Sequence, residues 1–183
     1  MSISSPKKLV NILAISGSLR QTSTNTRVLR VISQLAPIGV SVNLYEKLGS
    51  IPPFNPDFDG EQVDVSVDDF RAEIKAADAV LICSPEYAHG VSGVMKNALD
   101  WLVSSAELMN KPIGLINASP RSLFAHKAMI ETLTVMMAIV IPEASPTIAI
   151  PGRSLDEAGI LADEVLVSQL KSVLDALAGA VAS

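Results

Sequence analysis

The sequence predicts a doubly wound α/β domain in which helices cover both faces of a five-stranded parallel sheet. Short apolar runs alternate along the chain with segments of helical period, the pattern of repeated strand–helix–strand units. Several of the apolar runs contain almost no polar residue, which is typical of parallel strands buried on both faces. No repeat, low-complexity tract or long polar linker divides the 183 residues, so we expect one domain over residues 1–183.

Five segments are expected to form the strands, each of them short and mainly apolar. They are Leu9–Ile15, Val40–Tyr45, Ala79–Ser84, Ile113–Ala118 and Thr147–Ile150. In a doubly wound sheet, ligands bind outside the carboxyl ends of the strands, at the point where the strand order reverses. The loops that follow these strands are therefore the places to search for a binding site.

Three other segments carry apolar residues at three- and four-residue spacing, which predicts amphipathic helices. The segment Thr26–Ala36 has one apolar stripe and ends before Pro37 and Gly39, two residues that stop helices. A second helix is expected over Ser92–Val103, and a final helix over about Asp156–Ala178.

The composition indicates which partners the protein can have: copies of itself, nucleic acid or a membrane. Hydrophobic residues make up 49% of the chain and charged residues only 18%, which leaves extra apolar surface to cover, so we expect a homodimer or homotetramer. The formal net charge of −5 gives no basic field for a nucleic-acid backbone or an anionic membrane, so neither partner is expected. The longest apolar run outside the first strand, Val135–Ile141, is far shorter than the ~18 residues of a membrane span.

Two features bear on the compartment in which the protein works. Its single cysteine, Cys83, excludes an internal disulfide and a site built from several thiolates, which fits a reducing cytoplasm. Lys7 and Lys8 before the apolar Leu9–Ile15 mimic a signal peptide, but this stretch contains Asn11 and lacks a small-x-small cleavage site. We therefore expect a cytoplasmic protein.

The loop after the first predicted strand is rich in groups that bind phosphate. It places the guanidinium of Arg20 among several hydroxyls, and a helix follows at once. The hydroxyls belong to Ser16, Ser18, Thr22, Ser23 and Thr24. A phosphate monoester requires many short donors and a compensating charge, and a helix start adds free backbone N–H groups. On the loop alone, an ordinary turn whose hydroxyls only cap the helix stays an open alternative.

Other phosphate-binding loops fit the sequence poorly. Gly17 stands alone, so G-x-G-x-x-G is absent, and no G-x-x-x-x-G-K-[ST] occurs. The pattern therefore disfavours a dinucleotide pyrophosphate or a triphosphate at this loop.

A second loop, Ser84–Gly90, follows the third predicted strand. The first and third strands are neighbours in a doubly wound sheet, so this loop is expected to open beside the first. Pro85 and Gly90 favour a fixed backbone that approaches a ligand closely, which suits the edge of a flat heterocycle. One ligand can therefore touch both loops.

Together the two loops resemble the NADPH-dependent FMN reductase family, a branch of the flavodoxin-like fold that includes quinone, chromate and azo-dye reductases. The first family signature, G-S-L-R-x-x-S-x-N, is complete at Gly17, Ser18, Leu19, Arg20, Ser23 and Asn25. The second, near P-E-Y-N-x-S-x-P-G-x-L-K-N-A-x-D-W, appears at Pro85, Glu86, Tyr87, Gly93, Lys96, Asn97, Ala98, Asp100 and Trp101. The segment Ile51–Asp57 is also similar to the family's proline-aromatic loop.

The resemblance implies a flavodoxin-like sheet in the order 2-1-3-4-5, FMN as the cofactor, and NADPH or NADH as the electron donor. It implies that the first loop holds the FMN phosphate and that Pro85, Glu86 and Tyr87 flank the isoalloxazine. The full predicted cofactor-binding set is Ser16, Ser18, Leu19, Arg20, Ser23, Thr24, Asn25, Pro85, Glu86, Tyr87, Ala88 and Ser119. Ser119, with Pro120 and Arg121, follows the fourth predicted strand, and the resemblance suggests that this loop borders the flavin; a simple turn is an equal alternative.

Four positions depart from the second family motif. Ala88 stands where many members have asparagine, Gly90 where many have serine, Ser92 where many have proline, and Met95 where many have leucine. Because Ala88 lacks a side-chain amide, we expect any contact with the ring at this position to come from the backbone. His89 is expected to shape the nicotinamide or acceptor side.

The predicted function is an FMN-dependent NAD(P)H oxidoreductase that passes hydride from a nicotinamide to bound FMN and on to a small acceptor. The resemblance implies a quinone, azo dye, chromate, ferric chelate or free flavin as that acceptor. No catalytic acid, base or nucleophile is expected, because hydride moves directly between two stacked rings.

Two other functions are compatible with the phosphate loop. A flavodoxin-like electron carrier would bind FMN and react only with protein partners. Such carriers commonly shield the ring with aromatics, whereas aromatic residues make up just 4% of this chain. A binder or transferase for nucleoside monophosphates is the third interpretation.

The remaining candidates carry weaker signals. His89 and His126 lack the companions and spacing of a metal site, so no metal is expected. Cys83 lies in an apolar strand and is expected to be an inert core thiol. Trp101 is open to two interpretations, core packing or a subunit contact. The stretch Met129–Ile141, apolar on more than one helical face, is interpreted as core together with a candidate dimer surface.

Overall fold

The computed structural model describes residues 9–60, 62–150 and 155–182. Its main sheet has parallel strands in the spatial order β2-β1-β3-β6-β7. These are β1 (Val10–Ser16), β2 (Val40–Tyr45), β3 (Ala79–Cys83), β6 (Pro112–Ile116) and β7 (Ile139–Val140). Numbered along this sheet alone, the order is the predicted 2-1-3-4-5, and the doubly wound α/β fold is confirmed.

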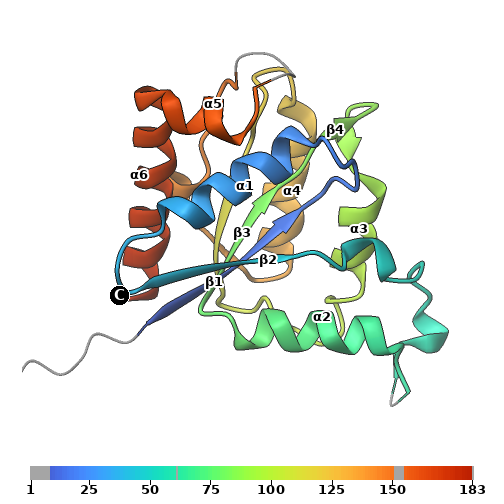
Figure 1. Ribbon diagram of the computed structural model, residues 1–183. Helices are drawn as coiled ribbons and strands as arrows, with labels where there is room; N and C mark the ends of the chain where they lie inside the picture. The colour runs from blue at the N-terminus through green and yellow to red at the C-terminus, as the bar shows by residue number, and fades with distance from the viewer. Residues whose placement is uncertain (1–8, 61, 151–154, 183) are drawn as a thin grey trace, which may run out of the picture.

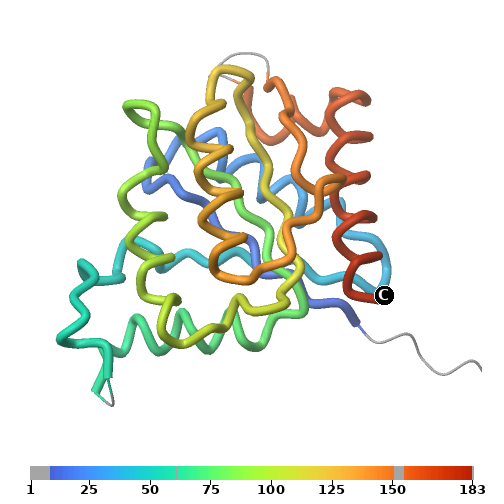
Figure 2. The backbone as a smooth tube through the Cα atoms, turned by 180° about the vertical axis from the view of Figure 1, so that it is seen from behind, coloured from blue at the N-terminus to red at the C-terminus, as the bar shows by residue number. Residues whose placement is uncertain are grey.

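Helices cover both faces of the sheet (Figures 1 and 2). They are α1 (Thr24–Leu35), α2 (Val65–Ala76), α3 (Gly93–Asp100), α4 (Leu123–Val135), α5 (Glu157–Ala162) and α6 (Glu164–Val181). One face packs against α1, α5 and α6, and the other against α2, α3 and α4. The main strands run toward a small hairpin, made of β4 (Glu86–Tyr87) and β5 (Gly90–Val91), which marks their carboxyl ends (Figure 1).

The central strand β3 joins two separate cores. All of its residues are buried, and their side chains alternate between the faces of the sheet. Val80 and Ile82 belong to the core under α2, α3 and α4, whereas Leu81 and Cys83 belong to the core under α1 and α6. The strand ends that carry the loops are therefore held from both sides.

The fifth strand does not lie where the sequence predicted it. The sheet edge is β7, and the expected strand Thr147–Ile150 contributes only a single bridge from Thr147 to Asn117. The reason is a detour through a 3₁₀ turn, Pro142–Ala144, which interrupts the ladder. Within the detour, the Ser145 hydroxyl accepts the Leu115 N–H at 3.0 Å, a bond that a strand partner would otherwise make.

The final helix is also divided, contrary to the single helix expected over Asp156–Ala178. Asp163 ends α5 and starts α6, because its carboxylate accepts the N–H groups of Val165 and Leu166 at 3.0 and 3.1 Å.

The first helix begins at Thr24, two residues before the prediction, and α3 ends at Asp100, short of the predicted Val103. Helix α2 was not predicted from the sequence.

The stretch Met129–Ile141 is not one helix. Helix α4 ends at Val135, and the chain turns through Met136 and Met137 into β7. Met129 and Leu133 are buried in the core, which confirms that part of the interpretation.

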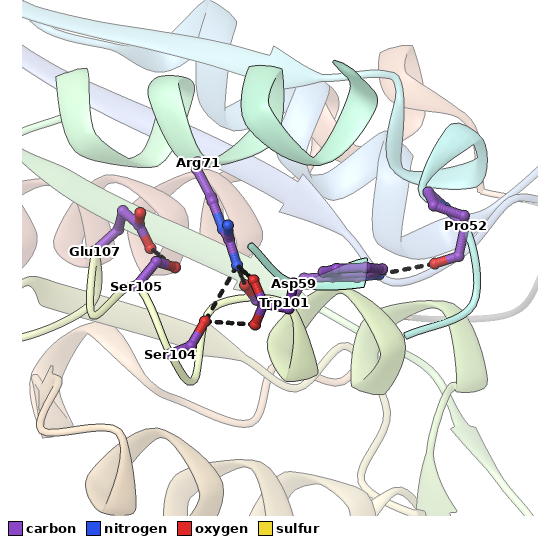
Figure 3. Close-up of polar contacts among 7 residues, drawn as sticks. All are labelled: Pro52, Asp59, Arg71, Trp101, Ser104, Ser105 and Glu107. Carbon is purple, nitrogen blue, oxygen red and sulfur yellow. Dashed lines mark hydrogen bonds and ion pairs between the residues drawn. The ribbon is translucent and has the colours of Figure 1, made fainter. Parts of the chain in front are cut away.

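Trp101 is a core residue. Only 1% of it is exposed, its indole N–H donates to the Pro52 carbonyl at 2.8 Å, and its ring meets Phe54 edge-on. Arg71 of α2 donates to the Trp101 carbonyl and pairs with Asp59 at 2.8 Å (Figure 3). These contacts fasten the proline-aromatic loop to α3, so the alternative of Trp101 as a subunit contact is wrong.

Gly114 in β6 tests how closely the 3₁₀ turn Pro142–Ala144 packs on the sheet. A Cβ at this position would lie 2.8 Å from Leu81 Cδ1 and 2.9 Å from the Ala144 carbonyl oxygen, too close for either. We expect Gly114→Ala to lower the free energy of unfolding by about 1–3 kcal/mol in urea titrations. The matched control is Gly179→Ala in α6, where a Cβ meets no described atom within 4 Å and which should gain up to about 1 kcal/mol. Equal stability of both variants would contradict the close approach.

Candidate functional site

A pocket of about 480 Å³ opens at the carboxyl ends of the strands. Its walls come from the loops that follow β1, β3 and β6, the three central strands of the sheet. The lining residues are Ser18, Arg20, Thr22, Ser23, Thr24, Asn25, Ser84, Pro85, Glu86, Tyr87, Asn117, Ala118, Ser119, Arg121, Ser122 and Ile150. This volume and position suit a cofactor-sized ligand.

The pocket brings together most of the predicted site. Every predicted cofactor-binding residue lines it except Ser16, Leu19 and Ala88. Ser16 is buried, and its hydroxyl lies 2.8 Å from the Thr26 hydroxyl. Leu19 is 58% exposed and lies against Gly49 beyond the pocket rim. The cofactor contacts of all the predicted residues stay predictions, both for those that line the pocket and for these three.

The first loop ends in a capped helix start. Ser23 is the N-cap of α1, and its hydroxyl accepts the Thr26 N–H at 3.4 Å, while the Arg27 N–H donates to the Ser23 carbonyl at 3.0 Å. The capping role proposed as an alternative for this loop is therefore real. Within the described residues, the backbone N–H groups of Thr24 and Asn25 have no partner, and Arg20 has no carboxylate. The loop thus caps the helix and also keeps donors and a positive charge for an anion.

The first and second loops touch at Gly17. A Cβ on Gly17 would lie 2.1 Å from the Ser84 hydroxyl and 2.6 Å from its Cβ, so only glycine fits. The Gly17 carbonyl accepts the hydroxyl of the buried Ser92 at 2.7 Å, and the Gly17 N–H donates to the Cys83 carbonyl at 2.9 Å. The two loops are held as one unit.

The second loop is a hairpin with a strained turn, a feature that the sequence analysis did not find. Tyr87 pairs with Gly90, and the two residues between them, Ala88 and His89, have φ angles of +47° and +60°. Such turns favour asparagine and glycine, because other residues meet their own backbone in this left-handed region. His89 stacks on Phe124 of α4, with ring centroids 4.2 Å apart.

Glu86 connects the hairpin to α4. Its carboxylate accepts the backbone N–H of Ala125 in the first turn of α4 at 2.8 Å. Ser122, at the N-cap, makes no side-chain cap of its own. The Glu86 side chain therefore stabilises the start of α4, while Tyr87, 53% exposed, stands at the mouth of the pocket.

The third loop contributes residues that the predicted set lacked. The buried Asn117 shapes it, because its amide donates to the Ser122 carbonyl at 3.2 Å and its Oδ1 accepts the Ser119 N–H at 3.2 Å. This arrangement places Arg121 and Ser122 in the pocket wall beside the predicted Ser119. The available signal was their position directly after a strand at the same edge of the sheet.

Cys83 and His126 are not among the residues that line the described pocket. Cys83 is fully buried, which confirms that it is a core residue, and burial raises the pKa of its thiol to about 12. The thiol donates to the Asn25 side-chain oxygen at 3.2 Å and thereby orients that amide at the start of α1. Burial lowers the pKa of half-buried His126. In the part of the chain that the structure describes, no three His, Cys, Asp or Glu side chains gather as a metal site requires.

Comparison with known proteins identifies the family. The family model for NADPH-dependent FMN reductases matches residues 10–150, which include every loop of the pocket. The chain belongs to the NADPH-dependent FMN reductase family. It is therefore an oxidoreductase, with FMN as its cofactor and NAD(P)H as its electron donor.

Several relatives of this reductase are similar over most of their length. An NAD(P)H-dependent FMN reductase of Pseudomonas aeruginosa is 32% identical, with 92% of this chain and 93% of the relative covered. An NADPH:quinone oxidoreductase of Arabidopsis thaliana is 34% identical, with 92% and 90% covered. In structure, the flavoenzyme NAD(P)H:(acceptor) oxidoreductase FerB of Paracoccus denitrificans superposes with a TM-score of 0.77 at 24% identity, covering 94% of this chain and 97% of FerB. The last likeness supports the flavodoxin-like fold.

The strained hairpin of the reductase yields a test at Ala88. We expect Ala88→Asn to raise the free energy of unfolding by about 0.5–1 kcal/mol, because asparagine tolerates the left-handed region better than alanine. Ala106→Asn is the control, since Ala106 has the same backbone conformation (φ +59°) outside the pocket lining. A stability gain in both variants, with FMN affinity altered only by Ala88→Asn, would place position 88 next to the cofactor. A loss of stability in Ala88→Asn would contradict the strain.

Proposed function

We propose that the described pocket binds FMN with its phosphate on the first loop and its ring along the second and third loops. We further propose that the reductase passes hydride from NAD(P)H through this site to a small acceptor. One observation carries the proposal: Arg20 and the start of α1 line the same pocket as the Pro85–Tyr87 edge. A phosphate-binding end and a flat-ring end thus share one cavity.

The residues at the phosphate end fit a monoester dianion. Ser18, Thr22 and Thr24 supply hydroxyls, and Arg20 supplies a planar donor pair whose charge persists at neutral pH. The unpartnered N–H groups of Thr24 and Asn25 add donors at the positive end of α1. The chain as a whole carries a net charge of −5, so the attraction to phosphate must come from these local groups.

The residues at the ring end leave one side open. When bound here, FMN would supply the redox chemistry, taking up hydride from the donor and passing the electrons on to the acceptor. Pro85 and Tyr87 border the ring position on the hairpin side, and the Glu86–Ala125 bond holds that hairpin in place. Tyr87 is the sole aromatic residue in the lining, so an electron carrier with a shielded ring is disfavoured. Room is left for a nicotinamide or acceptor to stack.

The acceptor that we propose is a quinone, azo dye, chromate, ferric chelate or free flavin. The relatives named as quinone oxidoreductase and FMN reductase support an acceptor small enough to enter an open pocket. The third-loop residues Ser119 and Ser122 offer hydroxyls on that side.

We also propose a cytoplasmic homodimer or homotetramer. Apolar side chains remain exposed where α4 ends, at Val135 (72%), Met137 (54%) and Ile139 (48%). Met109 (45%) lies close by, because the N–H of its neighbour Asn110 donates to the Met137 carbonyl at 2.9 Å. A second copy would cover this apolar surface, and light scattering of the purified protein reads the subunit count. Across residues 9–60, 62–150 and 155–182, no helix is long and apolar enough to cross a membrane.

Rapid mixing tests the proposed reaction. FMN-loaded protein should lose its visible flavin absorbance when it is mixed anaerobically with NADPH or NADH, and excess quinone should restore it. A carrier would bleach slowly and would not turn over with the quinone. Protein that is purified colourless and takes up no added FMN would favour the nucleoside monophosphate interpretation.

Arg20 tests the orientation of the cofactor. We expect Arg20→Ala to weaken FMN affinity by about 1.5–3 kcal/mol in fluorescence titrations, the scale of a charge-assisted hydrogen bond. Arg30→Ala is the control, since Arg30 lies on the exposed side of α1 and makes only surface ion pairs with Glu46 and Glu157. Unchanged affinity in Arg20→Ala would move the phosphate elsewhere.

A further inference from the structure

The pocket holds a second guanidinium, that of Arg121. It comes from the loop after β6, whereas Arg20 comes from the loop after β1, and β3 lies between these two strands. Two strand spacings correspond to roughly 10 Å, so the two arginines enter the pocket from opposite sides. Arg121 is exposed and, within the described residues, has no carboxylate partner.

Neither the phosphate of the proposed FMN nor a carboxylate of the described pocket lining pairs with Arg121. The proposed FMN carries a single phosphate, which is compensated by Arg20 and the start of α1. Among the described lining residues, Glu86 is the carboxylate; its Oε2 accepts the Ala125 N–H at 2.8 Å, and it makes no ion pair with Arg121. Because Arg121 is exposed, its guanidinium is hydrated in the free protein and stays available to pair with an anionic group of a ligand in the pocket.

The backbone that presents Arg121 is fixed. Its N–H donates to the Ser119 hydroxyl at 3.3 Å, and the Ser122 N–H donates to the Ser119 carbonyl at 3.0 Å. Asn117, only 2% exposed, holds both ends of this turn. The side chain therefore starts from a defined point in the pocket wall while its guanidinium stays available to a ligand.

We propose that Arg121 binds a phosphate group of the reduced nicotinamide dinucleotide while the nicotinamide ring lies on the open side of the flavin. This inference rests on the proposed function of the pocket. The donor is a polyanion, and it approaches a protein of net charge −5. A local positive charge on the substrate side, distinct from the one that holds FMN, offsets that repulsion.

The test compares donors with and without phosphate on FMN-loaded Arg121→Gln. Flavin reduction by NADPH and NADH at subsaturating concentration should slow about 10- to 100-fold, as expected for one lost charge-assisted bond. Reduction by N-benzyl dihydronicotinamide, which has no phosphate, should keep the wild-type rate. Calorimetric titration with NADP⁺, which does not react with oxidised flavin, should show affinity weakened by a similar factor. Arg30→Gln, with the same change in net charge, should match the wild type in each measurement.

Several outcomes would overturn the inference. An equal slowing with the phosphate-free donor would mean that Arg121 acts on the ring and not on a phosphate. Loss of FMN from Arg121→Gln would assign the residue to the cofactor. A third outcome is that donor kinetics and NADP⁺ affinity are unchanged, while a sulfonated quinone reoxidises the flavin of Arg121→Gln more slowly than that of the wild type and a neutral quinone does not. That result would assign Arg121 to the acceptor. Failure of the proposed function is a separate result, because then no donor bleaches the wild type.

Discussion

The close approach of Gly17 to Ser84 is the constraint on which the site depends. It brings the loop after β1 within contact of the loop after β3, and the buried Ser92 hydroxyl locks the pair through the Gly17 carbonyl. The strands beneath are fixed by cores on both faces of the sheet, so neither loop can move far without breaking packed contacts. The two loops thereby keep one separation, as the proposed placement of the FMN phosphate on the first loop and its ring along the second requires.

The hairpin after β3 is held against α4 by one contact from its first strand and one from its turn, and the turn itself is strained. Glu86 joins it to the first turn of α4, and His89 stacks on Phe124 of the same helix. Ala88 and His89 both take a left-handed conformation that costs free energy without asparagine or glycine. The contacts with α4 offset that cost, and they couple the position of Tyr87 to the start of α4 and so to the third loop.

The sequence contained enough to predict the sheet, its order and the residues of the first loop, because apolar periodicity and a dense phosphate-binding motif are local signals. It did not show the division of the last helix at Asp163 or the detour that moves the fifth strand to Ile139–Val140, since side-chain caps and prolines compete there with periodicity. The bond from Glu86 to Ala125 joins residues far apart in the chain, so a motif could suggest only that Glu86 was near the flavin. Arg121 was expected in a loop beside the flavin but was given no role of its own, because a lone arginine in a short loop matches no motif.

The interrupted edge of the sheet also limits how the protein can associate. A two-residue β7, Pro142 and Pro146 without N–H donors, and a Ser145 hydroxyl in place of a strand carbonyl leave little regular ladder on that side. An incoming extended segment finds no continuous row of donors and acceptors to pair with. Strand addition is therefore disfavoured at β7, and copies of the chain that meet near this edge would pack through side chains and not through a shared ladder.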